Sequence, residues 1–348
     1  MSNYNIIGID LAKRNFYIVA IDENRKAILK KSITREDFFS NFLLKLPENQ
    51  TFAFEACGGC HYMAQRLEAL GHKVIVLKPK DVKVYASSKQ KNDANDALAI
   101  CKAALDPELM KVHAKSKQEQ GISYLHKSRQ NVIQQRIQVS NGLITSLMEF
   151  GYIVKCGKTK FAKSCLTYVE EALKEQYFDE LVYTEMLIEC QEIQKLLERE
   201  NGLDKLIIQK NKESEIAIKL ETIPGIGPIN ASILSNKPMQ IYKSAKDFSA
   251  SLGLVPKQHT TGGKVSLGSI TKQGDRYART MLIQGARTIV MRSHRKDFSK
   301  KEDSIYKFIE RLESRGKGFN VVCVAVANKL ARIAYTCSMN NVEYNIAA

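Results

Sequence analysis

The sequence lacks the features by which membrane, secreted and disulfide-stabilised proteins are recognised. No apolar run approaches the roughly 20 residues that a membrane-spanning helix needs. The N-terminus does not show the basic and then apolar segments of a signal peptide. The eight cysteines are scattered along the chain and do not form a disulfide pattern. We therefore expect a cytoplasmic protein with reduced thiols that has no membrane as a partner.

Acidic residues are scarce relative to basic ones, with 37 Asp and Glu against 53 Lys and Arg and a net charge of +16. This imbalance favours a polyanionic partner such as nucleic acid. Residues 164–221 are the exception, because this stretch carries 14 acidic and 7 basic side chains. The nucleic-acid surface is therefore expected before and after that stretch. A length of 348 residues, 44% of them hydrophobic, suffices for two domains with sizeable cores.

Two further absences argue against a zinc site and against an ATPase. The only Cys-x-x-Cys motif, Cys57 to Cys60 with His61 beside it, lacks the second pair of ligands that a zinc site needs. Close packing of the two intervening glycines is the simpler explanation of that motif. The opening Gly8-Ile9-Asp10 also occurs in actin-like ATPases, but no glycine-rich phosphate loop follows a later strand. That absence argues against an ATPase.

The N-terminal third alternates between patterns typical of strands and of helices. Apolar and β-branched runs predict strands, and amphipathic spacing predicts helices between them. Three consecutive strands followed by alternating helix and strand indicate an α/β domain, a mixed sheet covered by helices. The expected strands are 4–10, 16–22, 27–33, 51–55 and 73–77, and the expected helices are 35–46, 60–70 and 93–105.

Four acidic residues stand out in this domain. Asp10 and Glu55 each end an apolar strand, and Asp93 and Asp96 lie one turn apart on one helix face. Taken singly, they could be a strand-end cap or solvated helix charges. Together, carboxylates from two strand ends and one helix can hold two divalent ions, Mg²⁺ or Mn²⁺, beside a phosphodiester. The set therefore indicates metal-dependent strand chemistry on DNA or RNA.

The middle of the chain reads as helical, over residues 115–150 and again over 166–220. Apolar residues of the second stretch recur at spacings of three, four and seven, which predicts a helical hairpin or a coiled coil. A coiled coil could also form a dimer interface. A helical linker packed on its own domain is an equally good interpretation.

A tight glycine turn, residues 223–228, opens the last third of the chain and precedes a helix. Backbone N–H groups around Gly225 and Gly227 can bind a phosphate at the helix N-terminus, as helix–hairpin–helix elements do. A plain turn between helices is the alternative. We expect a mainly helical domain around this element.

Residues 259–274 form a polar, glycine-bearing segment, and residues 258–264 are predicted, taken in isolation, to be a flexible polar loop. It offers the hydroxyl of Thr261 beside glycines and Lys264. An arginine-rich helix follows, and Lys272, Arg276 and Arg279 are expected to bind phosphates. A solvated basic face is the alternative reading of these cations.

The order of these motifs resembles one family, the DEDD transposases of bacterial insertion sequences. This is the insertion-sequence one-ten family, which includes the Piv invertases, and the spacing is similar to that of its eleven-eleven subgroup. The resemblance covers essentially the whole chain. It rests on Gly8-Ile9-Asp10-Leu11-Ala12-Lys13, Glu55-Ala56-Cys57-Gly58, Lys91-Asn92-Asp93-Ala94-Asn95-Asp96-Ala97, Ile223-Pro224-Gly225-Ile226-Gly227-Pro228, Leu252-Gly253-Leu254-Val255-Pro256 and Thr261-Gly262-Gly263-Lys264.

The resemblance implies three parts: a RuvC-like (RNase H-like) catalytic domain over residues 1–112, a long helical coiled-coil connector over 113–221, and a C-terminal transposase domain over 222–348. It implies that Asp10, Glu55, Asp93 and Asp96 form the metal-binding tetrad. It also implies donor and target DNA as substrates, a structured guide RNA encoded by the element, and a homo-oligomer, from dimer to tetramer, with active sites composed between subunits. The location implied is the bacterial cytoplasm, in association with the nucleoid.

The family is further understood to use a C-terminal serine hydroxyl, just before a glycine, as a covalent nucleophile. Here that position is Thr261, which can supply the same alkoxide. Ser266 or Ser269 could be the nucleophile instead, or the catalytic activity of this protein could be reduced. The predicted function is an RNA-guided DNA recombinase that moves its own insertion sequence. The alternatives are a RuvC-like nuclease that hydrolyses without a covalent intermediate, and an inactive nucleic-acid-binding protein.

Overall fold

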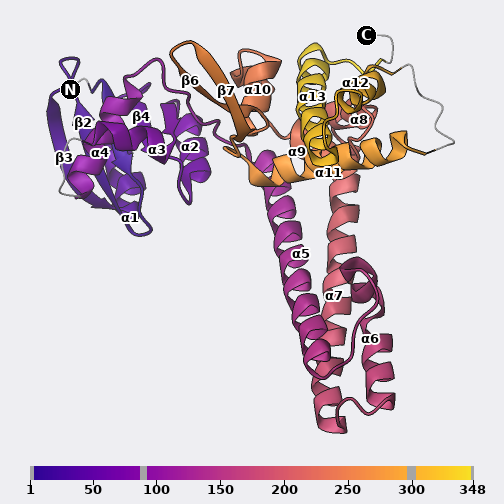
Figure 1. The fold of residues 1–348 in the computed structure, drawn as a ribbon. Coiled ribbons are helices and arrows are strands. Elements are labelled where there is room, and N and C mark those ends of the chain that lie inside the picture. Colours follow the sequence, from indigo (N-terminus) through magenta and orange to yellow (C-terminus); the bar gives the residue numbers. More distant parts are fainter. Residues whose placement is uncertain (1–3, 87–91, 296–302, 346–348) are drawn as a thin grey trace. The chain divides into compact units, whose positions relative to one another are not determined.

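The computed structural model describes residues 4–86, 92–295 and 303–345, and its internal contacts divide the chain into two compact units (Figure 1). The first unit comprises residues 1–120 and the second residues 121–348. The expected C-terminal domain and most of the expected helical connector, from residue 121 onward, fall within the second unit. The three-part division at residues 112 and 221 stays a prediction.

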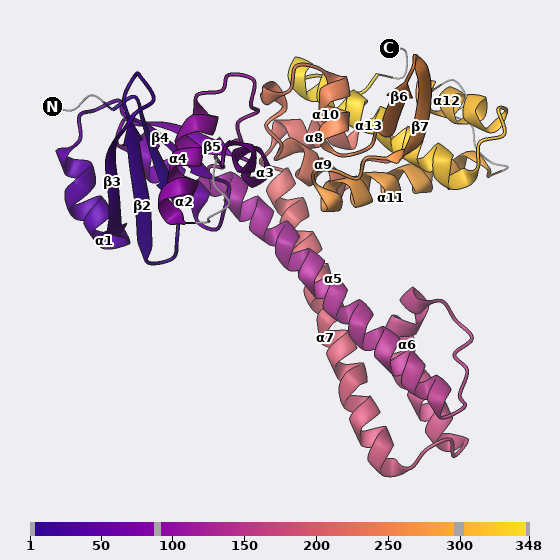
Figure 2. The same cartoon turned by 60° about the vertical axis from the view of Figure 1, so that its left-hand side comes forward.

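A five-stranded mixed sheet forms the centre of the first unit, in the order β3-β2-β1-β4-β5 (Figures 1 and 2). The first three strands of the chain pair antiparallel, whereas β4 and β5 join the other side of β1 in parallel. All five expected strands are present. Their bounds are β1 Ile6–Asp10, β2 Asn15–Ile21, β3 Ala27–Thr34, β4 Thr51–Glu55 and β5 Lys73–Leu77.

The two faces of this sheet have separate cores, because successive strand residues point to opposite sides. Ile9 and Phe54 pack on one face together with helix α2, Cys60–Ala69. Ala53 packs on the other face together with helix α4, Asp93–Ala104. A short helix α3, Pro79–Val82, and a 3-10 turn, Lys83–Tyr85, follow β5. The expected mixed sheet covered by helices is therefore confirmed.

The expected regular helix over residues 35–46 is wrong in detail. The segment begins as α1, Arg35–Asp37, widens into a π-helical turn, Phe38–Phe42, and ends as a 3-10 turn, Leu43–Lys45. Phe38 is fully buried, and its ring lies 5.7 Å from that of Phe42 and 5.4 Å from that of Phe16. Packing of this aromatic cluster outweighs the regular helical period.

Two long antiparallel helices, α5 (Lys117–Glu149) and α7 (Glu180–Asn211), form an arm in the second unit (Figure 1). Helix α6, Lys158–Lys174, joins them in an apolar core at the end of the arm. Arg136 pairs with Glu200 at 2.9 Å, and Arg129 pairs with Asp204. The structure thus contains a helical hairpin, while a coiled coil between chains stays a prediction.

The rest of the second unit is a helical bundle that carries one β-hairpin. The residues expected to be a flexible loop form this two-stranded hairpin instead, which corrects the prediction. Gly262 and Gly263 both have positive φ, 56° and 77°, so they make the tight turn that such a hairpin requires. The elements are α8 Glu215–Glu221, α9 Pro228–Ser235, a 3-10 turn Met239–Ile241, α10 Ala245–Ser251, β6 Pro256–Thr261, β7 Lys264–Ile270, α11 Arg276–Ser293, α12 Ser304–Glu313 and α13 Phe319–Asn340.

Helix α13 is the one helix among the described residues that is long and apolar enough to cross a membrane, judged by length and composition alone. Its side chains Val322, Val326 and Leu330 are fully buried in the core of the second unit. Packing between helices therefore accounts for its apolar composition.

Candidate catalytic and nucleic-acid-binding residues

Asp10 and Glu55 end two adjacent parallel strands, as the sequence predicted. Ile9 of β1 is in register with Phe54 of β4, so the two carboxylates occupy the next positions of neighbouring strands. Strand alternation places Asp10 on the same face as Gly8, and Glu55 on the same face as Ala53. That face is the one covered by α4.

Helix α4 begins one residue after Asn92, whose side chain accepts a hydrogen bond of 2.8 Å from the backbone N–H of Asn95. Asp93 and Asp96 lie in its first turn, exposed and half-buried respectively. The helix then crosses β1 at Gly8. A Cβ atom built there would lie 2.6 Å from the carbonyl oxygen of Ala97, the residue after Asp96.

Asp10 and Glu55 therefore lie on the sheet face that α4 covers, and α4 carries Asp93 and Asp96 in its first turn. Burial raises the pKa of the Cys57 thiol, and so do nearby Cys60, Asp10 and Glu55, which places both strand-end carboxylates around that thiol. Within the described residues, no three His, Cys, Asp or Glu side chains are grouped closely enough to hold a metal ion. The candidate donors themselves are all carboxylates, the oxygen ligands that Mg²⁺ and Mn²⁺ prefer.

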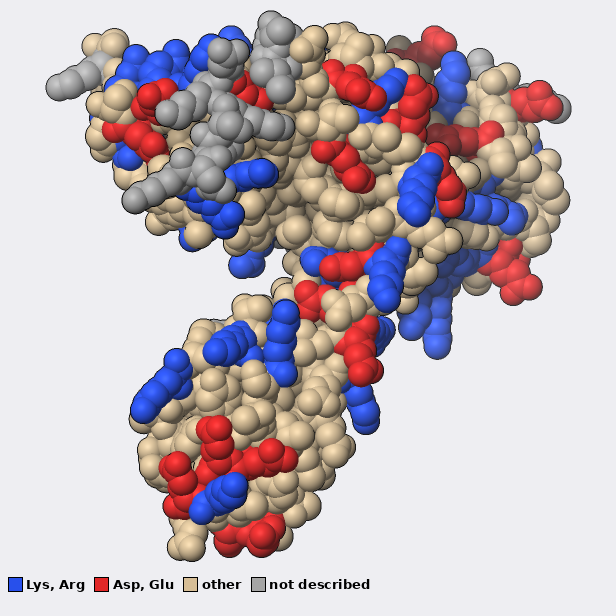
Figure 3. Space-filling view, turned by 90° about the vertical axis from the view of Figure 1, so that its right-hand side faces the viewer, with Lys and Arg blue, Asp and Glu red and all other residues tan. Residues whose placement is uncertain are grey.

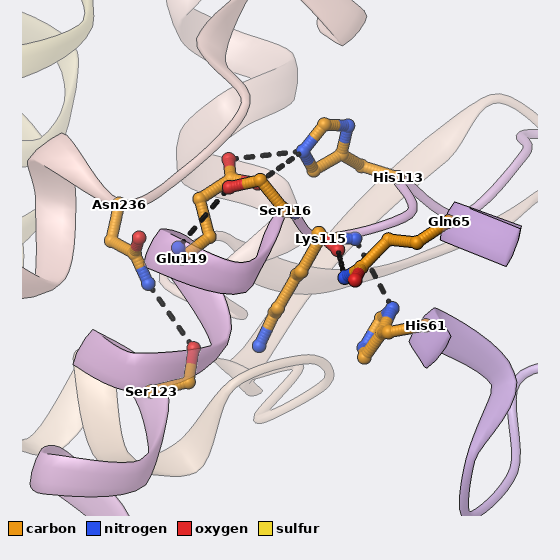
Figure 4. Close-up of polar contacts among 8 residues, drawn as sticks. All are labelled: His61, Gln65, His113, Lys115, Ser116, Glu119, Ser123 and Asn236. Carbon is orange, nitrogen blue, oxygen red and sulfur yellow. Dashed lines mark hydrogen bonds and ion pairs between the residues drawn. The ribbon is translucent and has the colours of Figure 1, made fainter. Parts of the chain in front are cut away.

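The expected close packing of the two glycines in the Cys-x-x-Cys motif is wrong, because Gly58 and Gly59 are exposed and a Cβ on Gly58 would meet no atom within 4 Å. Cys60 is buried in α2, and the Nδ1 atom of His61 accepts a hydrogen bond of 3.2 Å from the backbone N–H of Lys115 (Figure 4). Gln65 on the same helix donates to the carbonyl oxygen of Lys115 at 2.6 Å. These contacts fasten residues 113–120 to α2. Burial, and then the charge of Lys115, lower the pKa of His61.

In the glycine turn after α8, Gly225 packs against a neighbouring helix, whereas Gly227 is exposed. Gly225, with a φ of 83°, faces α11 so closely that a Cβ on Gly285 would lie 2.1 Å from the Gly225 carbonyl oxygen. Gly227 is exposed, occupies the N-cap of α9 and has no atom within 4 Å of a built Cβ. Gly227 therefore has the space that a phosphate contact needs, whereas Gly225 fits the turn against a neighbouring helix. No local motif pointed to Gly285 as the partner of this turn.

The expected phosphate-binding cations differ in their surroundings. Lys272 is exposed in the segment between β7 and α11, and Arg276 is exposed as the first residue of α11. Arg279 is only 8% exposed, and its Nη1 donates to the carbonyl oxygens of Leu252 and Gln273, each at 2.9 Å. The guanidinium of Arg279 thus ties two backbone segments together. Its role in binding nucleic acid stays a prediction.

Charge is also unevenly placed on the arm. Acidic side chains gather at its end, over α6 and the start of α7 (Figure 3). A cavity of about 790 Å³ there is lined by Glu170, Glu171, Asp179 and Glu180 among others. This distribution agrees with the expectation that nucleic acid binds elsewhere.

Thr261, the candidate nucleophile, is the last residue of β6 and is exposed. Its register partner across the turn is Lys264. Thr260 points to the opposite face of the hairpin, where its Oγ1 accepts a hydrogen bond of 3.1 Å from Gln258. A Gly-Gly pair flanked by threonines and Val265 was the sequence signal that could have predicted this hairpin.

Comparison with known proteins places these features in one family. Residues 7–151 match a family model for DEDD transposases of the IS110 type, described as "Transposase". Residues 217–301 match a second model, described as "Transposase IS116/IS110/IS902 family". The two matches contain Asp10, Glu55, Asp93 and Asp96 on one side and Thr261 on the other.

Full-length relatives agree with these matches. A transposase for insertion sequence element IS1328 from Yersinia enterocolitica is 33% identical over 99% of this chain and 100% of the relative. A probable family 20 transposase from Pseudomonas aeruginosa is 34% identical over 96% of both chains. The transposase for IS1111A from Coxiella burnetii is 30% identical over 100% of this chain and 93% of the relative.

The family models and the full-length relatives define this chain as a transposase, a DNA recombination enzyme. This chain belongs to the IS110 family of insertion-sequence transposases, as the order of its motifs predicted.

Proposed function

We propose that this transposase cuts and rejoins DNA through a covalent protein–DNA ester. In this proposal Asp10, Glu55, Asp93 and Asp96 bind Mg²⁺ or Mn²⁺, and the hydroxyl of Thr261 attacks the phosphodiester. The observation that carries the proposal is that Asp10 and Glu55 end adjacent strands on the sheet face covered by α4, the helix that bears Asp93 and Asp96, in a protein of the DEDD family.

The four acids are held by rigid elements. Asp10 and Glu55 end adjacent hydrogen-bonded strands, and Asp93 and Asp96 are fixed by the close contact of α4 with Gly8. Two divalent ions on such carboxylates would activate a nucleophile and stabilise the departing 3′ oxygen. Carboxylates on strands and helices hold their positions better than carboxylates on loops.

Thr261 has the exposure that a nucleophile for a large substrate needs, because it lies at the turn of a projecting hairpin. Attack by its hydroxyl would conserve the energy of the phosphodiester in a protein–DNA ester, ready for rejoining. The additional methyl group of threonine restricts the rotamers of the hydroxyl relative to serine. A Thr261→Ser variant should therefore be active.

The partners proposed are donor and target DNA and a structured guide RNA encoded by the element, bound by a dimer to tetramer of this chain. Exposed Lys272 and Arg276 beside the hairpin, and the open N-cap at Gly227, support binding to phosphates. We place Lys264 in the same group by its position beside Thr261. Association with the nucleoid would follow from these contacts.

The test uses purified protein, Mg²⁺, the RNA that flanks the element and supercoiled DNA carrying the element junction. Protein covalently attached to DNA is resolved on a denaturing gel. Wild type is compared with Thr261→Ala and Asp10→Asn. Thr260→Ala is the matched control for the hydroxyl, because Thr260 is adjacent but lies on the other hairpin face. Asp22→Asn, in the turn after β2, is the control for the acid.

An adduct that is lost in Thr261→Ala and Asp10→Asn, and kept in both controls, would support a recombinase with a hydroxyl nucleophile. Cleavage without an adduct that survives Thr261→Ala would instead indicate a hydrolytic nuclease. Binding of nucleic acid without cleavage in wild type would indicate an inactive binding protein. Omitting the RNA shows whether strand cleavage depends on a guide.

A further inference from the structure

The hairpin sorts its polar side chains onto two faces. Register pairs His259 with Ser266 and Thr261 with Lys264, and paired residues of an antiparallel ladder share a face. Gln258 and Thr260 point the other way, together with Val265 and Leu267, and the hydrogen bond from Gln258 to Thr260 confirms that assignment. His259 and Thr261 therefore lie on the same face.

We propose that His259 is the general base that takes the proton from the Thr261 hydroxyl. This inference rests on the proposed role of Thr261 as nucleophile. Residues two apart on a strand have Cα atoms about 7 Å apart, a separation that histidine and threonine bridge directly or through one water molecule. Histidine is the side chain best suited to this role near neutral pH.

The register of the hairpin also distinguishes the three candidate hydroxyls, those of Thr261, Ser266 and Ser269. Ser269 lies beyond Leu267, in the stretch of β7 where the register shifts, and is farther along the ladder from His259 than Ser266 is. Ser266 lies directly across from His259, where its hydroxyl can hold the second imidazole nitrogen in place. Thr261 is exposed and lies directly next to the turn formed by Gly262 and Gly263. Ser266 becomes a positioning residue.

The proposed step balances without an external reactant. The imidazole of His259 accepts the proton as Oγ1 of Thr261 forms a bond to phosphorus. The bond from phosphorus to the 3′ oxygen breaks, and its electron pair leaves with that oxygen. The imidazolium, or water exchanging with it, returns the proton to the 3′ oxygen. One phosphodiester is exchanged for another, and the reverse sequence rejoins the strand.

The two hairpin strands carry no acidic residue that would compete with His259 for the proton. Lys257 lies two residues before His259 on β6, and Lys264 is the first residue of the paired strand β7. Neither hairpin strand contains an aspartate or a glutamate. His259 is therefore the one side chain of the hairpin whose chemistry suits a general base near neutral pH.

The experiment measures the single-turnover rate of adduct formation between about pH 5.5 and 8.5, the range in which histidine titrates. In wild type the rate should rise with pH as His259 loses its proton. His259→Ala should lower the rate about 10²- to 10⁴-fold, as expected for loss of a general base, and should remove that rise. Added imidazole should restore part of the rate in His259→Ala only. Gln258→Ala, on the neighbouring residue of the opposite face, is the matched control.

The outcomes separate this inference from the proposed function. If wild type forms the Thr261 adduct and His259→Ala forms it at the same rate with the same pH profile, His259 is not the base and the nucleophile stands. A slower rate with an unchanged pH profile and no imidazole rescue also overturns the inference, because it indicates a structural role. If wild type forms no adduct, both the nucleophile and its base are refuted. His259 is exposed, so circular dichroism should show an unchanged fold in each variant.

Discussion

Substitution of Gly8 by alanine tests whether the crossing of α4 over β1 positions the candidate metal ligands. The added Cβ would lie 2.5 Å from Sγ of Cys101 and 2.6 Å from the carbonyl oxygen of Ala97, whereas ordinary contacts are 3.4–4 Å. Helix α4 must therefore move outward by about 1 Å, an overpacking that typically lowers the free energy of unfolding by about 1–3 kcal/mol. Asp96 is adjacent to Ala97 and moves with it.

Two readouts follow from that displacement. A misplacement of about 1 Å in a catalytic constellation can reduce the rate about 10²-fold, so adduct formation should fall by that order. Urea unfolding followed by circular dichroism should show the loss of stability, and hydrogen exchange should locate it in residues 93–104. Cys101→Ala in the Gly8→Ala background removes one close contact but not the Ala97 carbonyl, so it should recover only part of the stability.

Gly58→Ala is the matched control, because a Cβ there meets no atom within 4 Å although Gly58 is three residues from Glu55. It should change neither stability nor rate measurably. If Gly8→Ala were as stable and as active as Gly58→Ala, the close contact between β1 and α4 would not hold the acids in place. The argument that Gly8 positions Asp96 would then be refuted.

Three other perturbations give independent checks. Gly285→Ala would bring a Cβ within 2.1 Å of the Gly225 carbonyl oxygen, and should lower the free energy of unfolding in urea by about 1–3 kcal/mol. Arg279→Ala leaves two backbone carbonyls without their donor and should lower the melting temperature, whereas Arg276→Ala should leave it unchanged and reduce the salt dependence of DNA binding. Burial, and then the charge of Arg129, lower the pKa of His126 to about 4. Because the unfolded pKa is about 6.5, the stability linked to His126 is complete above that pH and is lost as the pH falls toward 4, by at most about 3 kcal/mol. Unfolding measured at pH 8 and pH 5 should show a smaller pH dependence in His126→Gln than in wild type.

The first unit shows how much a strong local pattern can predict. Each strand was expected within one or two residues because β-branched and apolar runs end at turn residues, and Asp10 and Glu55 were recognised because they end such runs. The helix at Asp93 follows a capping Asn92, also a local signal. Residues 35–46 could not be predicted in the same way, because the rings that distort them come from β2 and β4.

Contacts between segments that are distant in the chain could not be predicted either, because they leave no local pattern in the sequence. Gly225 was expected to turn its backbone toward a phosphate, yet its partner, Gly285, is 60 residues away and gives no local sign of the contact. Arg279 belongs to a basic helix by composition, but its guanidinium is used by two carbonyl oxygens that precede it in the chain. Composition predicts that a region is basic. It does not predict which cations remain available to bind a partner.

The choice among hydroxyls depends on the register of one short hairpin. With the observed register, His259 and Thr261 share a face, and Gln258 with Thr260 occupies the other. If either strand slipped by one residue, His259 and Thr261 would still share a face, because that depends only on alternation along β6. Each residue of β6 would, however, lie opposite a different residue of β7. Ser266 would then no longer lie across from His259. Substitutions at Gly262 or Gly263, whose positive φ angles fix the turn, should therefore affect the positioning of the imidazole more than the presence of the nucleophile. Comparing Gly263→Ala with Ser266→Ala should give a similar shift in the pH profile of adduct formation if register is what joins Ser266 to His259.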